Sequence, residues 1–256
     1  MPLPRTAAEA AAPAPEKVRV VAPASGAPFN EVESVILRRR SVRNFRQTQV
    51  PEYLVKRVLE CGRYAPSAGN NQSWKYAVVR DPALIEEMTA HTRRWARRLN
   101  RLVDPTSPGA LTNRVVATGV NWLLSHVSTG RMHPTGLAGL AQLASGELGL
   151  WHGAPTVILL LVDPRGPGKP LLDVGIAGQN MVLAAHSMGL GTCWVSFSMF
   201  LPLKRKYRDL FGIHYPLQFA TSIALGYPLG QPDGFVPRET HETAWYEPGG
   251  VQKMVY

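Results

Sequence analysis

Apolar residues recur at helical spacing in the first third of the chain. In NEVESVILRRRSVRNF (residues 30–45) they stand three to four residues apart, which predicts a helix that ends near the arginines. In VPEYLVKRVLECGRYAPS (residues 50–67) the same spacing predicts a second helix, and Pro51 suits its first turn. The apolar positions of these two helices are Val32, Val35, Ile36, Leu54, Val58 and Leu59.

Further strands and helices follow from the same patterns. The strand segments are WKYAVVRDP with its closing turn (74–82), the apolar run from Thr156 to Val162, and QFATSIALGYP (218–228). The helix segments are DPALIEEMTAHTRRWARRLNRL (81–102), DVGIAGQNMVLAAHSMGLG (173–191) and LKRKYRDLFGI (203–213). The long small-residue helix should end at Gly189 and run into a fourth strand.

Helices and strands alternate along the chain, but the helices bunch at the front. This order favours an α+β or a mixed α/β fold around a central sheet of a few strands. With 256 residues, 45% of them hydrophobic, the chain can bury a sizeable core. Its longest apolar run, residues 154–163, is far shorter than the roughly 20 residues of a membrane-spanning helix. We therefore expect no membrane partner.

The first thirty residues are rich in Ala and Pro and lack the basic start, apolar centre and cleavage pattern of a secretory signal. We interpret residues 1–30 as an N-terminal arm and expect the protein to be cytoplasmic. The two cysteines, Cys61 and Cys193, form no CxxC pair, so the sequence indicates neither a disulfide framework nor a zinc site. We expect both to be small, buried packing residues, and we expect no bound metal.

The formal net charge of +10 at first suggests nucleic acid or an anionic membrane as a partner. Much of the excess lies in HTRRWARRLNR (91–101), where five arginines follow helical spacing on one side. A solvated basic face is the favoured interpretation, and attraction of an anionic ligand is the alternative. Because neither zinc-finger spacing nor an aromatic RNA-binding strand accompanies the arginines, we expect no nucleic-acid partner.

Three polar segments are suited to an anionic ring ligand. In RRRSVRNF (38–45) arginines surround a serine, and guanidinium groups pair well with phosphate or carbonyl oxygens. PSAGNNQ (66–72) and GLGT (189–192) add glycines, which allow close backbone approach, and PSAGNNQ also has amides that pair with a heteroaromatic edge. The sequence lacks GxxxxGK[ST], GxGxxG, GxSxG and HExxH. These segments therefore indicate a flat, polar, phosphorylated ring system as the ligand.

Several motifs, taken in order, carry a family resemblance. RRSVRNF, APSAGNNQSW, HGAPTVI, QNMVLAAHSMGLGTCW, IALGYP and a late PRE together resemble the FMN-dependent nitroreductase family between Val32 and Thr240. The resemblance implies an α+β fold with a central, mostly antiparallel sheet flanked by helices. It also implies an intertwined homodimer with FMN at the subunit interface. The FMN-binding domain would span residues 31–240, with a variable substrate-side segment at about 100–150 and a tail over 241–256.

The resemblance also implies roles for individual residues. The FMN phosphate, ribityl chain and pyrimidine edge would contact Arg39, Arg40, Ser41 and Arg43, with Arg238 of PRE joining the phosphate. A loop of the partner subunit would lie along the flavin ring through Pro66, Ser67, Ala68, Gly69, Asn70 and Gln72. Backbone N–H groups would point towards N5 and O4 of the ring from Leu190, Gly191 and Thr192.

The implied reaction has two steps. NADH or NADPH passes hydride to N5 of FMN and leaves, and a small-molecule acceptor such as a nitroaromatic or a quinone then takes the electrons. FMN carries this chemistry, so no catalytic side chain is assigned, and solvent or ribityl hydroxyls are expected to supply protons.

Other functions remain open at this point. Ser73 stands where the family usually has proline, and the arm, the segment at about 100–150 and the tail leave the substrate undetermined. The same fold and FMN could serve a flavin-fragmenting dimethylbenzimidazole synthase, a reductive dehalogenase or a tailoring dehydrogenase. A nonenzymatic basic binding protein is the remaining hypothesis.

Overall fold

The computed structural model describes residues 17–18, 28–103, 134–230, 236, 238–239, 242–248 and 250–255. The chain forms two compact units, a larger one over Arg39–Pro232 and a smaller one over Met1–Arg38 and Asp233–Tyr256. Most of the predicted arm, and residues 104–133 of the predicted variable segment, lie outside the described residues. The predicted division into arm, domain and tail therefore stays a prediction.

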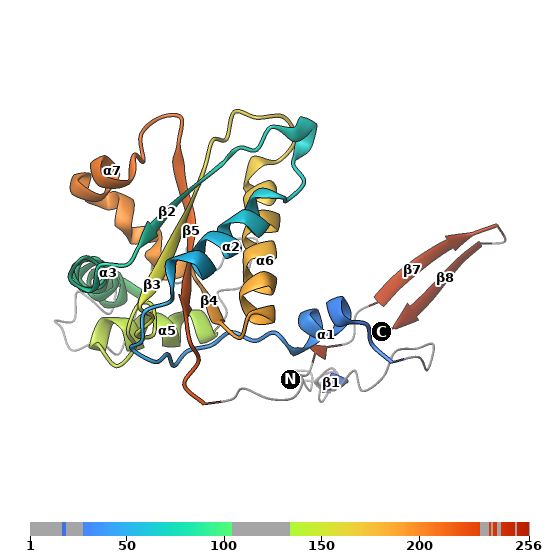
Figure 1. Cartoon of the computed structure of the whole chain (residues 1–256), viewed down its shortest axis with the longest axis horizontal. Helices are drawn as coiled ribbons and strands as arrows, with labels where there is room; N and C mark the ends of the chain where they lie inside the picture. Colours follow the sequence, from blue (N-terminus) through green and yellow to red (C-terminus); the bar gives the residue numbers. More distant parts are fainter. Residues whose placement is uncertain are drawn as a thin grey trace, which may run out of the picture. The chain divides into compact units, whose positions relative to one another are not determined.

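The larger unit is built on a four-stranded sheet with the order β2-β3-β5-β4 (Figure 1). Its strands are β2 (Trp74–Val79), β3 (Thr156–Val162), β4 (Gly191–Val195) and β5 (Gln218–Gly226). Every neighbouring pair is antiparallel. This confirms the α+β class and the antiparallel sheet, and all four strands lie where the apolar pattern predicts them.

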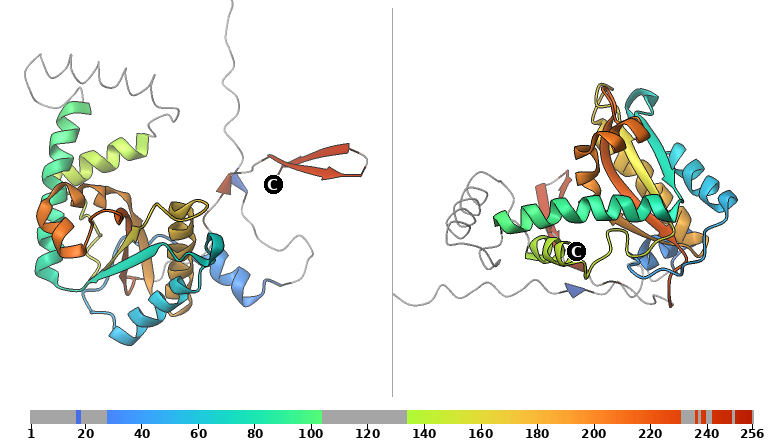
Figure 2. Two further views of the ribbon diagram at one scale, coloured as in Figure 1. Left: turned by 90° about the horizontal axis from the view of Figure 1, so that it is seen from above. Right: turned by 90° about the vertical axis from the view of Figure 1, so that its left-hand side faces the viewer.

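Helices cover both faces of this sheet (Figure 1). One face packs against α3 (Pro82–Val103), α5 (Pro134–Ser145), the short 3-10 helix η2 (Ser196–Leu203) and α7 (Arg205–Phe211). The other packs against α2 (Glu52–Arg63) and α6 (Pro170–Ser187). Both views of Figure 2 show α3 and α5 side by side. The larger unit thus has three layers, with the sheet in the middle.

The central strand β3 shows why the sequence folds into three layers. All seven of its residues are buried, although successive side chains of a strand point to opposite faces. Val157, Leu159 and Leu161 join the core beneath α3 and α5. The alternate residues pack against α2 and α6, and they are Ile158, Leu160 and Val162. A strand with no polar side requires cover on both faces, and the helices supply it.

The two cysteines differ in burial. Cys193 on β4 is buried, as predicted, but Cys61 on α2 is exposed, so its predicted burial is wrong. The stripe of α2 that faces α6 consists of Leu54, Val55, Val58 and Gly62, and Cys61 lies off that stripe. Among the described residues, no cluster of His, Cys, Asp and Glu could hold a metal ion. No described helix combines the length and apolarity needed to cross a membrane.

The smaller unit joins segments from both ends of the chain. It contains α1 (Glu31–Arg38), which ends at the arginines as predicted. Strand β1 (Lys17–Val18) pairs with β6 (Arg238–Glu239). The tail forms an antiparallel hairpin of β7 (Glu242–Glu247) and β8 (Gly250–Val255), which the apolar pattern did not predict.

Candidate functional site

The arginine-rich segment and the GLGT turn, far apart in the sequence, meet at one edge of the sheet. Ser41 forms a parallel bridge with Thr192 at the start of β4, and the Val42 N–H donates to the Thr192 carbonyl at 2.9 Å. Three residues after Val42, Phe45 bridges to Pro228 just after β5. The segment that follows Arg38 is therefore fixed by backbone bonds beside both strands.

Gly191 is the position that allows this approach. A Cβ built on Gly191 would lie 2.7 Å from Val42 Cγ2 and 2.9 Å from Val42 Cβ, closer than ordinary van der Waals contact. Only glycine therefore fits here without displacing the arginine-rich segment. This places two of the predicted FMN-binding motifs against each other by direct packing.

The turn before β4 has a well-defined shape. Gly189 adopts a positive φ of 75° directly after α6, which confirms it as the predicted helix end. The N–H of Leu190 donates to the Ala185 carbonyl at 2.9 Å. Because this N–H is already engaged, the contact predicted between Leu190 and the flavin ring would compete with a helix-closing bond.

The arginines at this edge include an unsatisfied donor. Arg40 Nε is buried and has no hydrogen-bond partner among the described residues, which is costly unless an acceptor is supplied. Burial raises the pKa of the Cys193 thiol, while the charges of Arg43 and Arg39 act in the opposite direction. A buried guanidinium donor and two nearby cations fit an anionic, oxygen-rich group, and the donor set therefore fits the phosphate and carbonyl oxygens of FMN.

The predicted flavin loop lies elsewhere. Its short 3-10 helix η1 (Ala68–Asn70) sits at the start of α6, where the Ala68 N–H donates to Asp173 Oδ2 at 3.4 Å. With 18 residues, α6 is about 27 Å long. Its far end carries the turn that meets the arginine-rich segment, and Figure 1 shows the two regions at opposite ends of this helix. Within one chain they do not form a single site.

The loop itself is shaped by its own side chains. The Gln72 N–H donates to Ser67 Oγ at 2.9 Å, and Gln72 Nε2 donates to Asn70 Oδ1 at 3.1 Å. Positive φ angles occur at Gly69, Asn70 and Gln72. Ser73, the departure from the family pattern, is buried, and no described residue forms a hydrogen bond with its hydroxyl.

A cavity of about 640 Å³, called here the α5 cavity, opens beside the arginine-rich segment. Arg43 is the one predicted FMN residue that lines it. The other lining residues are Gly136, Ala138, Gly139, Gln142, Leu143, Leu148, Leu150, His152, Cys193, Trp194, Val195, Ser196 and Phe197. A smaller cavity of about 340 Å³ lies between Ser41–Asn44 and Pro228–Gly230, and it contains both Ser41 and Arg43.

His152 of the α5 cavity was not among the predicted site residues. Burial lowers the pKa of its imidazole below the ordinary value, and the charge of Arg43 lowers this pKa further, so both effects favour the neutral ring. The segment HGAP, directly before the buried strand β3, contains it. In the sequence this segment served only as a family marker, because nothing local shows that its histidine faces a cavity.

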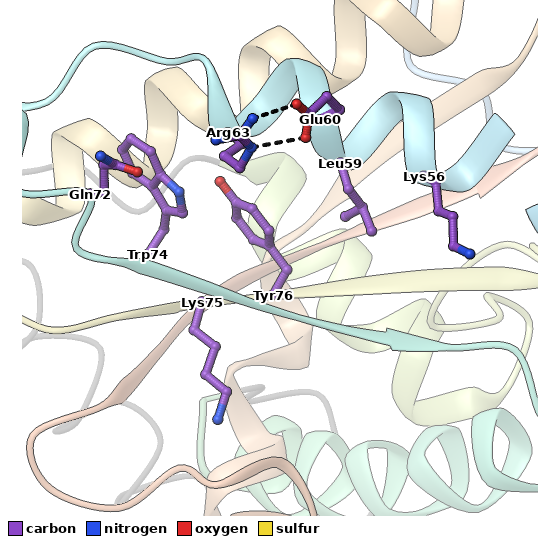
Figure 3. Close-up of a pocket in the computed structure, with 8 residues that line it drawn as sticks. All are labelled: Lys56, Leu59, Glu60, Arg63, Gln72, Trp74, Lys75 and Tyr76. Carbon is purple, nitrogen blue, oxygen red and sulfur yellow. Dashed lines mark hydrogen bonds and ion pairs between the residues drawn. The ribbon is translucent and has the colours of Figure 1, made fainter. Parts of the chain in front are cut away.

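A third cavity, also of about 640 Å³, lies between α2 and β2 (Figure 3). Figure 3 shows Tyr76 pointing from β2 towards the pair formed by Arg63 and Glu60, whereas Lys75 points away. Burial raises the pKa of Tyr76, and in the described part of the chain its hydroxyl has no hydrogen-bond partner. Because Arg63 is already paired with Glu60, at 2.9 Å from Nε to Oε2, this cavity is a poor candidate for an anionic ligand.

Arg238, the last predicted phosphate contact, is exposed on β6 of the smaller unit. Its predicted contact with the phosphate stays a prediction.

Comparison with known proteins identifies the chain's relatives. Residues 36–227 match the nitroreductase family. A protein of Methanothermobacter thermautotrophicus, provisionally named NADH dehydrogenase/NAD(P)H nitroreductase, is 26% identical over 84% of this chain and 88% of its own length.

Solved structures show the same fold. A nitroreductase with bound FMN from Desulfitobacterium hafniense superposes with a TM-score of 0.59 at 23% identity, covering 82% of this chain and 95% of its own. The FMN-dependent nitroreductase NfnB from Mycobacterium smegmatis, solved in complex with NADPH, gives a TM-score of 0.51 at 25% identity. The superposition covers 77% of this chain and 86% of the NfnB chain.

Proposed function

The chain belongs to the nitroreductase family of oxidoreductases, and we propose that it is a homodimeric, FMN-dependent NAD(P)H oxidoreductase. The observation that carries the proposal is the contact between the arginine-rich segment and the start of β4. The Val42–Thr192 hydrogen bond holds three arginines beside the glycine turn, and one of them has a buried donor without a partner. NfnB, a relative that binds FMN and NADPH, supports the choice of cofactor and electron donor.

The chain's own residues would bind FMN as follows. Arg39, Arg40, Ser41 and Arg43 would hold the phosphate, the ribityl chain and the pyrimidine edge. The backbone N–H groups of Gly191 and Thr192 would point towards the flavin ring, whereas the Leu190 N–H already donates to the helix end. When bound, FMN supplies the hydride chemistry, accepting electrons from NAD(P)H and passing them to an organic acceptor such as a nitroaromatic or a quinone.

The position of the flavin loop supports a dimer. Residues 66–72 lie about one length of α6 away from the arginines of their own chain, so a second copy would have to bring its loop to this site. The first turn of α6 has two leucines on its outward side, Leu171 and Leu172, both more than half exposed. Within the described part of the chain, a Cβ built on Gly175 of the same side would meet no neighbouring side chain within 4 Å. We infer that this face packs against the second copy.

The dimer can be tested without disturbing the core. Leu172→Arg places a charge on the exposed face of α6, and Leu210→Arg makes the same change at an equally exposed leucine of α7. We expect Leu172→Arg to weaken the dimer at least about tenfold in light scattering and to lower bound FMN in parallel, since both depend on the second copy. The Leu210→Arg control should keep both. A fully dimeric, flavin-loaded Leu172→Arg protein would contradict this arrangement.

The cofactor and reaction are tested on the purified protein. It should be yellow, with a flavin spectrum that NADH or NADPH bleaches under anaerobic conditions and that an acceptor restores. Arg40→Ala and Arg43→Ala should release FMN while the protein stays folded. A colourless protein that fails to bind added FMN refutes the proposal. Consumption of FMN in oxygen would favour the flavin-fragmenting reaction instead.

A further inference from the structure

The flavin loop, residues 66–72, has a strained backbone. Gly69, Asn70 and Gln72 have positive φ angles of 59°, 53° and 48°. Glycine adopts such angles freely and asparagine tolerates them, but for glutamine the left-handed conformation is unfavourable. A backbone of this kind persists only where surrounding residues impose it. The contacts of the loop with the rest of the chain therefore determine its shape.

One neighbouring segment lies along the loop. Residues 163–169 (DPRGPGK), called here the β3–α6 connection, lead from the end of β3 to the start of α6. The Asp163 N–H donates to the Ser73 carbonyl at 2.8 Å, which continues the antiparallel pairing of β2 with β3. The loop precedes β2 and the connection follows β3, so the two segments leave the same end of the sheet side by side.

Gly168 allows the connection to approach the loop closely. A Cβ built on Gly168 would lie only 2.6 Å from Ala68 Cβ, and Gly168 itself has a positive φ of 70°. At Gly166 a Cβ would instead meet the Asn71 side chain, 3.0 Å from its Cγ. An amide can rotate away, but the Cβ of Ala68 cannot move without its backbone. A methyl group at position 168 would therefore push the loop and the connection apart.

Asp173 holds the loop from the first turn of α6. Its side chain is buried, and Oδ2 accepts the Ala68 N–H at 3.4 Å. This N–H opens η1, where the preceding Ser67 provides no side-chain cap because its Oγ accepts the Gln72 N–H. A carboxylate is a strong acceptor for a backbone N–H. Asp173 thus supplies the capping bond that the loop itself does not provide.

The β3–α6 connection is fixed independently of the loop. Arg165 Nη2 pairs with Asp163 Oδ2 at 2.7 Å, and its guanidinium carbon lies 5.6 Å from the centroid of the Tyr215 ring. At the other end the Lys169 carbonyl accepts the Leu172 N–H at 2.8 Å. The connection can therefore act as a support against which the loop is shaped.

We propose that Gly168 and Asp173 are positioning residues for the FMN site of a second copy of this chain. They hold residues 66–72 in the left-handed shape in which the loop enters that site, so a change at either residue acts in the partner's site and not in the site of its own chain. Leu171 and Leu172, which are proposed to face the second copy, directly precede Asp173. This inference rests on the proposed function and extends its FMN site beyond the residues that contact the flavin.

The first test is a double-mutant cycle on the FMN dissociation constant, measured by fluorescence titration of the flavin-free, full-length protein. Gly168→Ala should raise this Kd at least about tenfold. In an Ala68→Gly background, where the overlapping methyl group is absent, the same change should raise the Kd less than about threefold. Equal effects in the two backgrounds would overturn the role of Gly168.

The matched control is Gly212→Ala at the end of α7. Gly212 has a nearly equal φ of 67°, and its new methyl group would meet only the flexible amine of Lys75, at 3.3 Å. Both alanine variants should lower the urea midpoint similarly, because the backbone strain is the same. Only Gly168→Ala should weaken FMN binding, and an equal loss of FMN in Gly212→Ala would show that general destabilisation is the cause.

The second test separates hydrogen bonding from charge at Asp173. Asp173→Ala removes the acceptor, and Asp173→Asn keeps a carbonyl oxygen that can accept the Ala68 N–H. We expect the Kd for FMN to rise about five- to tenfold in Asp173→Ala and to stay within about twofold in Asp173→Asn. Equal losses in both variants would overturn the role assigned to this hydrogen bond.

The third test asks in which subunit the loop acts. Copies with Arg40→Ala and copies with Gly168→Ala carry different affinity tags, and the mixed dimer is purified through both. One of its sites combines intact arginines with an intact loop, so it should bind about one FMN per dimer with the wild-type Kd, although both parent homodimers bind weakly. If the loop served its own chain, both sites of the mixed dimer would be defective.

The outcomes distinguish this inference from the proposed function. A mixed dimer without a tight site overturns action on the partner's site. Wild-type FMN affinity in Gly168→Ala and Asp173→Ala overturns the positioning role alone and leaves the flavoenzyme intact. A wild-type protein that binds no FMN refutes the proposed function, and this inference with it.

Discussion

The contact between Gly191 and Val42 makes a sharp prediction about the FMN site. In Gly191→Ala the new methyl group would meet Val42 Cγ2 at 2.7 Å and Val42 Cβ at 2.9 Å, so the arginine-rich segment must move away from β4. Overpacking of this kind costs about 1–3 kcal/mol, and loss of the Val42–Thr192 hydrogen bond adds about 1 kcal/mol. We expect the free energy of unfolding to fall by about 2–4 kcal/mol and FMN to be lost.

The measurement is urea unfolding at one fixed protein concentration, together with the flavin content of the purified protein. Gly136→Ala is the matched control, because among the described residues no neighbouring side chain lies within 4 Å of its new methyl group, and it should stabilise α5 by up to about 1 kcal/mol. Val42→Ala removes both Cγ atoms, so Gly191→Ala combined with Val42→Ala should lose less stability than the two single changes added together. Wild-type stability and flavin content in Gly191→Ala would refute the reasoning.

Three further predictions concern the frame around the site. Gly178→Ala should lower the free energy of unfolding by about 1–3 kcal/mol in urea, despite better helix propensity, because the new methyl group overlaps the ring of Trp194; a gain in stability would contradict the packing of α6 on the sheet. Burial lowers the pKa of His91, so the unfolded chain binds its proton first and stability should fall as the pH drops below about 6.5. His91→Gln should make that fall less steep between about pH 7.5 and about pH 5.5, and an unchanged slope would contradict the assignment to His91. Ser222→Ala leaves the buried Trp151 Nε1 without its acceptor and should lower the free energy of unfolding by about 1–3 kcal/mol, measured by thermal or urea unfolding. An unchanged free energy of unfolding would show that another group replaces this hydrogen bond.

Local patterns were sufficient for most of the secondary structure of the larger unit. The spacing of Leu54 and Val58 predicts α2, the apolar run from Thr156 to Val162 predicts a buried strand, and Gly189 marks the end of α6. These features depend on periodicity and on backbone freedom within a few neighbouring residues, which the sequence displays directly. The β7–β8 hairpin was not predicted, because every residue of β7 is exposed and the strand shows no buried side that alternation could reveal.

Burial of individual residues was harder to predict, because it depends on which side of an element faces a neighbour. Cys61 and Cys193 looked alike in the sequence, yet one lies off the stripe of α2 that contacts α6 and the other lies under α5. His152 was missed for the same reason, since its exposure to the α5 cavity arises from contacts with Ser222 and Gln47 that lie far away in the chain.

The sequence by itself determined the elements, the chemistry of the arginine and glycine segments, and the family to which these motifs belong. Only the tertiary structure decided which segments meet. It placed Ser41 and Val42 against Thr192, and it separated the flavin loop from them by the length of α6. The physical reason is that strand register and helix packing bring together residues remote in sequence, and no local pattern specifies those distances.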